Sequence, residues 1–96
     1  MVKEISAQDF VTLDKDKITI VDMREETEYS DNRFEKSINI PVSKFWVKVD
    51  NIPKDKPVYV FCNSGYFSQE IVILLEERGY DATNVLGGWQ EIKSCL

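Results

Sequence analysis

A cysteine at the start of a short polar loop is the part of this chain best suited to chemistry. Residues 62–68 read Cys-Asn-Ser-Gly-Tyr-Phe-Ser, between an apolar run at 58–61 and an amphipathic segment. Loop N–H groups and the positive end of a helix dipole both stabilise a thiolate relative to a thiol. A thiolate attacks sulfur, phosphorus or arsenic centres, so the pattern predicts that Cys62 is a nucleophile. The competing interpretation, an inert core cysteine, explains the polar residues after Cys62 poorly.

The segments around this loop alternate between strand-like and helix-like patterns. Continuous apolar and β-branched runs are typical of strands buried on both faces, and they predict strands at 2–5, 18–21, 38–40, 58–61 and 82–86. Amphipathic or capped segments predict helices after Ser6, over 25–29 before a turn at 30–32, from Ser43 through 49, over 68–78 and from Gly87 onwards.

This alternation predicts an α/β fold with a mainly parallel five-stranded sheet flanked by helices on both faces. Active sites of such sheets lie outside the carboxyl ends of the strands. Cys62 follows one predicted strand, Asp22 to Arg24 follow another, and Gly87-Gly88 follow a third. We therefore expect these three features to converge at one edge of the sheet.

Composition narrows the class of protein. The chain has 96 residues, 43% hydrophobic and 30% charged, which predicts one compact domain over 1–96. Its net charge of -5 opposes binding to nucleic acid or to an anionic membrane, so neither is an expected partner. No run approaches the about 20 apolar residues of a membrane span, and no signal-type core follows the first residues, so the expected location is the cytoplasm.

Cysteine and histidine usage limits the possible chemistry. Two cysteines are too few for a disulfide scaffold, and the absence of histidine removes zinc sites of the usual kind and every imidazole base. We expect no metal and no cofactor. Gly87-Gly88 lacks the longer spaced pattern of a nucleotide-binding loop and is interpreted as a tight turn.

Successive landmarks along the chain together resemble the rhodanese-like family. They are Asp22-Met23-Arg24, Glu28-Tyr29, the segment 38–41, the Cys62 loop and Gly87-Gly88-Trp89. The family pattern around the cysteine is Cys-Arg-Ser-Gly-x-Arg-Ser. Matching residues here are Cys62, Ser64, Gly65 and Ser68.

The resemblance implies transfer of sulfane sulfur from a small donor to a thiol or protein acceptor. Cys62 would hold the sulfur as a persulfide, and the backbone N–H groups of 63–68 would surround its terminal sulfur. The substrate-binding loop would comprise Asn63, Ser64, Gly65, Tyr66, Phe67 and Ser68. Asp22 and Arg24 are interpreted as structural supports of the loop edge, with Asp22 bonding backbone and Arg24 pairing with Glu25, Glu26 or Glu28.

Two departures from the family pattern concern the donor. Asn63 and Phe67 stand where the pattern carries basic residues, so the cations expected to meet dianionic thiosulfate are missing. A lost guanidinium weakens both donor binding and charge stabilisation. The sequence therefore predicts weak use of thiosulfate, with Tyr66 and Phe67 forming an aromatic rim suited to a less charged donor or a protein partner.

Other functions stay open at this point. A noncatalytic rhodanese-like module that binds a partner or senses redox state would keep the fold and would tolerate Cys62→Ser. Cysteine-based phosphatase or arsenate chemistry on a related fold ranks below it, because its dual-specificity form has a longer loop followed by an arginine. Cys95 is interpreted as an incidental thiol, although a second thiol within reach could reduce a persulfide.

Overall fold

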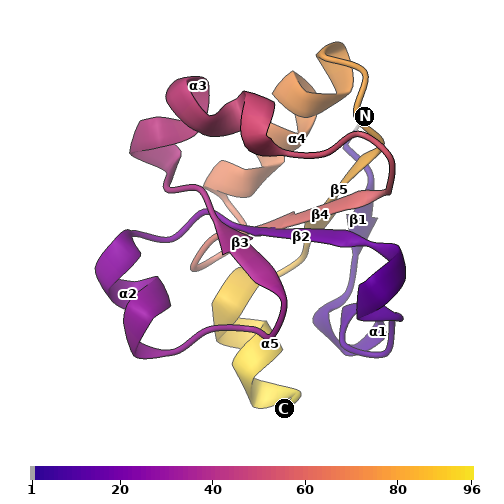
Figure 1. The fold of residues 1–96 in the computed structure, drawn as a ribbon. Coiled ribbons are helices and arrows are strands. Elements are labelled where there is room, and N and C mark those ends of the chain that lie inside the picture. Colours follow the sequence, from indigo (N-terminus) through magenta and orange to yellow (C-terminus); the bar gives the residue numbers. More distant parts are fainter. Residues whose placement is uncertain (1) are drawn as a thin grey trace.

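A computed structural model describes residues 2–96 as one parallel sheet with helices on both sides (Figure 1). The strand order is β1-β5-β4-β2-β3, and every neighbouring pair is parallel. The strands are β1 (Glu4–Ile5), β2 (Thr19–Asp22), β3 (Ser37–Asn39), β4 (Val58–Phe61) and β5 (Ala82–Val85). The predicted fold class and strand pattern are confirmed.

The helices are short apart from one. They are α1 (Ala7–Phe10), α2 (Glu26–Asp31), α3 (Phe45–Lys48), α4 (Phe67–Glu77) and α5 (Gly88–Ser94), with three 3-10 turns at Lys15–Lys17, Val42–Lys44 and Val49–Asn51. Within residues 2–96, no helix is both long and apolar enough to cross a membrane.

The two faces of the sheet have separate hydrophobic clusters. On one face α3 and α4 cover the central strands (Figure 1). Val21, Val58 and Val60 belong to the cluster on this face. On the other face α1 and α5 pack against Ile20 and Phe61. Adjacent residues of β2 thus point to opposite sides, as strand geometry requires.

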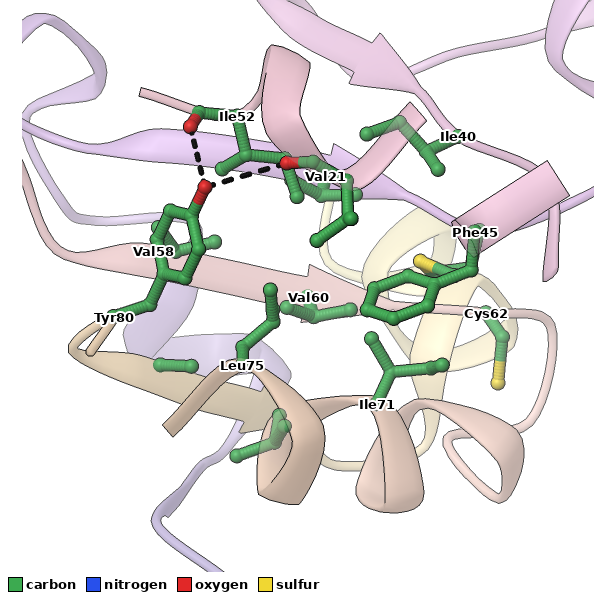
Figure 2. Close-up of a cluster of buried hydrophobic side chains, with 14 residues drawn as sticks. Val21, Ile40, Phe45, Ile52, Val58, Val60, Cys62, Ile71, Leu75 and Tyr80 are labelled. Atoms are coloured by element: carbon green, nitrogen blue, oxygen red, sulfur yellow. Dashed lines mark hydrogen bonds between the residues drawn. The ribbon is translucent and has the colours of Figure 1, made fainter. Parts of the chain in front are cut away.

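The cluster on the α3 and α4 face reaches the predicted nucleophile. Figure 2 shows Cys62 at one end of it, near Ile71 and Phe45, and Tyr80 at the opposite end. The Tyr80 hydroxyl donates to the Ile52 carbonyl at 2.7 Å, so this polar group is satisfied inside the apolar layer. The base of the Cys62 loop is therefore fixed by close-packed side chains.

Several predicted helix boundaries need correction. Ser6 caps α1 as predicted, because its Oγ accepts from the Asp9 N–H at 3.1 Å. Ser43 does not cap α3; it lies inside the 3-10 turn that follows Pro41, and the N-cap position belongs to Lys44. The predicted turn at 30–32 is also wrong at its start, since α2 continues to Asp31.

Candidate active site at the Cys62 loop

The thiol of Cys62 stands at the end of a central strand and just before the longest helix. Cys62 directly follows β4, which pairs with β2 and β5, and α4 begins at Phe67. The four residues between them must turn sharply. Gly65 makes this possible, with φ of +84°, a conformation that costs other residues free energy.

The start of α5 holds this loop from the opposite side. The Trp89 N–H donates to the Cys62 carbonyl at 2.8 Å, and the Gln90 N–H donates to the Asn63 carbonyl at 3.2 Å. First-turn N–H groups of a helix have no partner within it, so these loop carbonyls satisfy them. Loop carbonyls therefore face α5, while loop N–H groups remain available to the thiol.

Close backbone contact with the loop explains the glycine that begins α5. Gly88 has φ of +58°, and a Cβ there would lie 2.3 Å from the Cys62 carbonyl oxygen and 2.8 Å from the Gly65 nitrogen. No side chain fits without displacing the loop. The predicted tight turn at Gly87-Gly88 is present, and it shapes the loop that carries Cys62.

Gly88→Ala is therefore expected to lower the free energy of unfolding by about 3 kcal/mol, through overpacking and a left-handed backbone. Gly79→Ala is the matched control: Gly79 has φ of +91°, but a Cβ added there would meet nothing within 4 Å. It should cost about 1–2 kcal/mol from the backbone alone. Urea unfolding measures both, and equal losses would contradict a specific clash between residue 88 and the loop.

The sulfur of Cys62 is almost enclosed and receives hydrogen bonds. Cys62 is 5% exposed, the Gly65 N–H donates to Sγ at 3.2 Å, and Ser68 Oγ lies 3.5 Å from Sγ. Burial raises the pKa of the Cys62 thiol, but the Ser68 hydroxyl and the N–H groups of Ser68, Gly65 and Ser64 outweigh it. The pKa is thus held below its ordinary value.

Asn84 supports this arrangement from β5 and was not identified from the sequence. Its side chain is fully buried; Oδ1 accepts from the Ser68 hydroxyl at 2.5 Å, and Nδ2 donates to the Gly65 carbonyl at 3.4 Å. The side-chain amide of Asn84 therefore hydrogen-bonds Gly65, at the turn of the Cys62 loop, and Ser68, at its end. The only sequence signal was a polar residue inside an otherwise apolar predicted strand.

Ser68→Ala is expected to raise the pKa of Cys62, since burial remains while the hydroxyl whose single proton can turn from Asn84 Oδ1 to the Cys62 thiolate is removed. Less thiolate then exists at neutral pH, so the midpoint of alkylation rate against pH moves upward. Ser64→Ala is the control, because Ser64 is exposed and keeps its N–H. An unmoved midpoint in Ser68→Ala, or an equal shift in Ser64→Ala, would contradict the role of the hydroxyl.

Asp22 and Arg24 form a buried ion pair at the carboxyl end of β2. Arg24 Nη2 lies 2.8 Å from Asp22 Oδ2 and also donates to the Asn32 carbonyl at 2.6 Å. The guanidinium lies over the Trp89 ring, 4.4 Å from its centroid. Asp22 also accepts from the Arg24 N–H, as predicted, but the ion-pair partner of Arg24 is Asp22 and none of Glu25, Glu26 or Glu28.

A pocket of about 330 Å³ opens onto Cys62 and mixes apolar with acidic groups. Met23, Val42 and Phe67 supply apolar walls, and Phe67 is 66% exposed. Glu25 and Glu28 supply carboxylates.

Of two exposed loop residues, Asn63 lines this pocket and Tyr66 does not. Asn63 donates from Nδ2 to Glu28 Oε2 at 2.8 Å. Tyr66 is 79% exposed and lies outside the lining of the pocket. Of the predicted aromatic rim, Phe67 alone borders the pocket.

Cys95 belongs to a different region. It follows α5, is half-buried against the cluster on the α1 and α5 face, and lines a separate pocket of about 640 Å³ with Ser6 and Glu91. Both cysteines are free. The larger pocket therefore does not contain the candidate nucleophile.

Known proteins resemble this chain over nearly its whole length. The family profile described as rhodanese-like domain matches residues 6–95. The thiosulfate sulfurtransferase GlpE of Coxiella burnetii is 28% identical over 96 residues, covering 98% of this chain and 90% of that protein. A sulfurtransferase of Allochromatium vinosum is 28% identical over 91 residues, covering 92% of this chain and 85% of that protein. The crystal structure of a rhodanese-related protein from Thermoplasma volcanium superposes with a TM-score of 0.88 at 30% identity, covering 96% and 91% of the two chains.

Proposed function

The chain belongs to the rhodanese-like domain family, and from this premise we propose that it is a sulfurtransferase that carries sulfane sulfur on Cys62. The observation that supports this most is the environment of the sulfur. Cys62 lines a pocket, and the pKa of its thiol is lowered by hydrogen bonds from the loop that begins with it. A lowered pKa favours the thiolate, and a thiolate that opens onto a pocket can attack a donor sulfur.

The proposed first step is attack of the Cys62 thiolate on the outer sulfur of a persulfide, R–S–SH. A new S–S bond forms to Cys62 as the S–S bond of the donor breaks, and its electron pair leaves with R–S⁻. The products are Cys62–S–SH and the thiolate. No external oxidant or reductant is consumed, because sulfane sulfur only changes its carrier.

In the second step a thiophilic acceptor removes the sulfur. Cyanide attacks the outer sulfur, the Cys62 S–S bond breaks with its electron pair going to the Cys62 sulfur, thiocyanate leaves, and the proton of the outer sulfur is transferred to Cys62. The N–H groups of Ser64, Gly65 and Ser68 would stabilise the negative charge on sulfur before and after transfer. These loop residues would position the sulfur, and Gly65 would permit their turn.

We propose that thiosulfate is a weak donor. Arg24 is the only cationic side chain in the pocket lining of the described chain, and its guanidinium already bonds Asp22 and the Asn32 carbonyl. Phe67 and Asn63 provide no positive charge. A dianionic donor would therefore approach Cys62 without the charge-assisted hydrogen bonds that usually bind such oxygens.

Formation of thiocyanate from cyanide tests this function. The protein is assayed with the persulfide of 2-mercaptoethanol and, separately, with thiosulfate as the donor. We expect enzyme-dependent turnover with the persulfide and a much lower kcat/KM with thiosulfate. Absence of turnover with both donors would contradict the proposal and favour a noncatalytic interaction module.

A further inference from the structure

The charge at the mouth of the Cys62 pocket indicates which sulfur donors the pocket favours. This inference rests on the proposed function. Glu28 and Glu25 line the pocket, and neither takes part in any ion pair among residues 2–96. The partner of Glu28 is the amide of Asn63, which is neutral. The Glu28 carboxylate is thus held in place by a hydrogen bond, and no ion pair among residues 2–96 compensates its negative charge.

Neighbouring cations are already paired with other carboxylates. Arg24 bonds Asp22, and Lys44 bonds Glu26 at the start of α2. The whole chain also has a net charge of -5, so no distant excess of positive charge offsets the local field. An anionic donor would meet repulsion at this pocket.

The remaining walls favour a small donor with an apolar stem. Met23, Val42 and Phe67 lie in the same lining as the two carboxylates. The volume of about 330 Å³ is at the small end of ligand pockets. An alkyl chain could contact these side chains while a positive charge at its end lies near Glu28.

We propose that Glu28, together with Glu25, selects persulfides of small cationic thiols, and that Asn63 positions the Glu28 carboxylate for this role. Glu28 is thus a specificity-determining residue of the pocket. The reaction stays as written above, with R carrying a protonated amine. The two carboxylates act on donor binding, before sulfur is transferred, so their effect is expected in kcat/KM.

Three matched donors test this proposal: the persulfides of cysteamine, 2-mercaptoethanol and 3-mercaptopropionate, which are cationic, neutral and anionic. Single-turnover persulfidation of Cys62 is followed by intact mass at low ionic strength. Each rate is divided by the rate of the same donor with a free uncharged thiol, which removes differences in leaving-group reactivity. We expect the normalised rate to be about tenfold higher for the cationic than for the anionic donor, and this ratio to fall as salt is added.

Glu28→Gln isolates the role of the carboxylate. Gln keeps an oxygen that can accept from Asn63, so the loop should stay in place, while the cation-to-anion ratio should fall to about threefold. Glu77→Gln is the control, because it removes the same charge from an exposed site at the end of α4 without changing the pocket. It should leave the ratio unchanged.

The outcomes separate this inference from the proposed function. Equal normalised rates for the three donors, or equal losses of the ratio in Glu28→Gln and Glu77→Gln, would overturn the charge selection and leave sulfur transfer intact. No persulfidation by any donor would overturn sulfur transfer itself. Alkylation of Cys62 in Glu28→Gln at the rate of the unchanged protein verifies that its loop is folded.

Discussion

Cys62→Ser is expected to reduce transfer of sulfur from a persulfide to cyanide by at least about 10³-fold. A serine hydroxyl is not ionised near neutral pH and cannot hold sulfane sulfur as a persulfide. Oxygen replaces sulfur in a site with the Gly65 N–H and the Ser68 hydroxyl as partners, so the fold should remain intact. Thiocyanate production in the steady state measures the loss.

Cys95→Ser provides the matched control for this substitution. Cys95 lines the separate pocket near Ser6 and Glu91, and we expect its replacement to change turnover less than twofold. Comparable losses in both variants would show that Cys95 takes part as a second thiol. Retained turnover in Cys62→Ser would contradict Cys62 as the sulfur carrier.

Phe67→Arg is expected to increase kcat/KM for thiosulfate by about 10- to 100-fold. Phe67 lines the pocket at the first residue of α4, and it is exposed enough to be replaced at little cost in stability. A guanidinium there could donate to the oxygens of the donor, and charge-assisted hydrogen bonds contribute about 1.5–3 kcal/mol each. The helix dipole adds attraction for an anion at the same position.

Phe67→Gln separates charge from the loss of the aromatic ring. It introduces a polar side chain of similar reach without a positive charge, so kcat/KM for thiosulfate should stay within about threefold of the unchanged protein. Steady-state kinetics with thiosulfate and with 2-mercaptoethanol persulfide measure both variants. If Phe67→Gln gained as much as Phe67→Arg, or if Phe67→Arg gained nothing, missing charge would not explain weak use of thiosulfate.

Local sequence patterns were sufficient to predict most of the strands and helices. The β-branched run before Asp22 and the apolar run before Cys62 both form strands at the centre of the sheet, because such residues suit burial on two faces. The helix predicted over 68–78 is present as α4, and Gly79 follows its last turn with a left-handed backbone. Ser43 failed as a cap because Pro41 is followed by a 3-10 turn that precedes α3.

The parts of the site that could not be predicted depend on contacts between distant residues. The bond between Asn63 and Glu28 joins a loop after β4 to α2, and the bond between Ser68 and Asn84 joins α4 to β5. Neither follows from spacing along the chain, because both require the order of strands in the sheet. The wrong partner of Arg24 has another cause, since Asp22 lies only two residues away: both side chains are buried, where a guanidinium requires a paired charge.

Intact mass of the persulfide intermediate is the most direct test of the central claim that Cys62 carries sulfur. Reduced protein is mixed with 2-mercaptoethanol persulfide, freed of donor, weighed, and weighed again after addition of cyanide. We predict an increase of one sulfur atom that is absent in Cys62→Ser, and its loss with release of one thiocyanate per chain. An unchanged mass, or an adduct that persists in Cys62→Ser, would contradict the account.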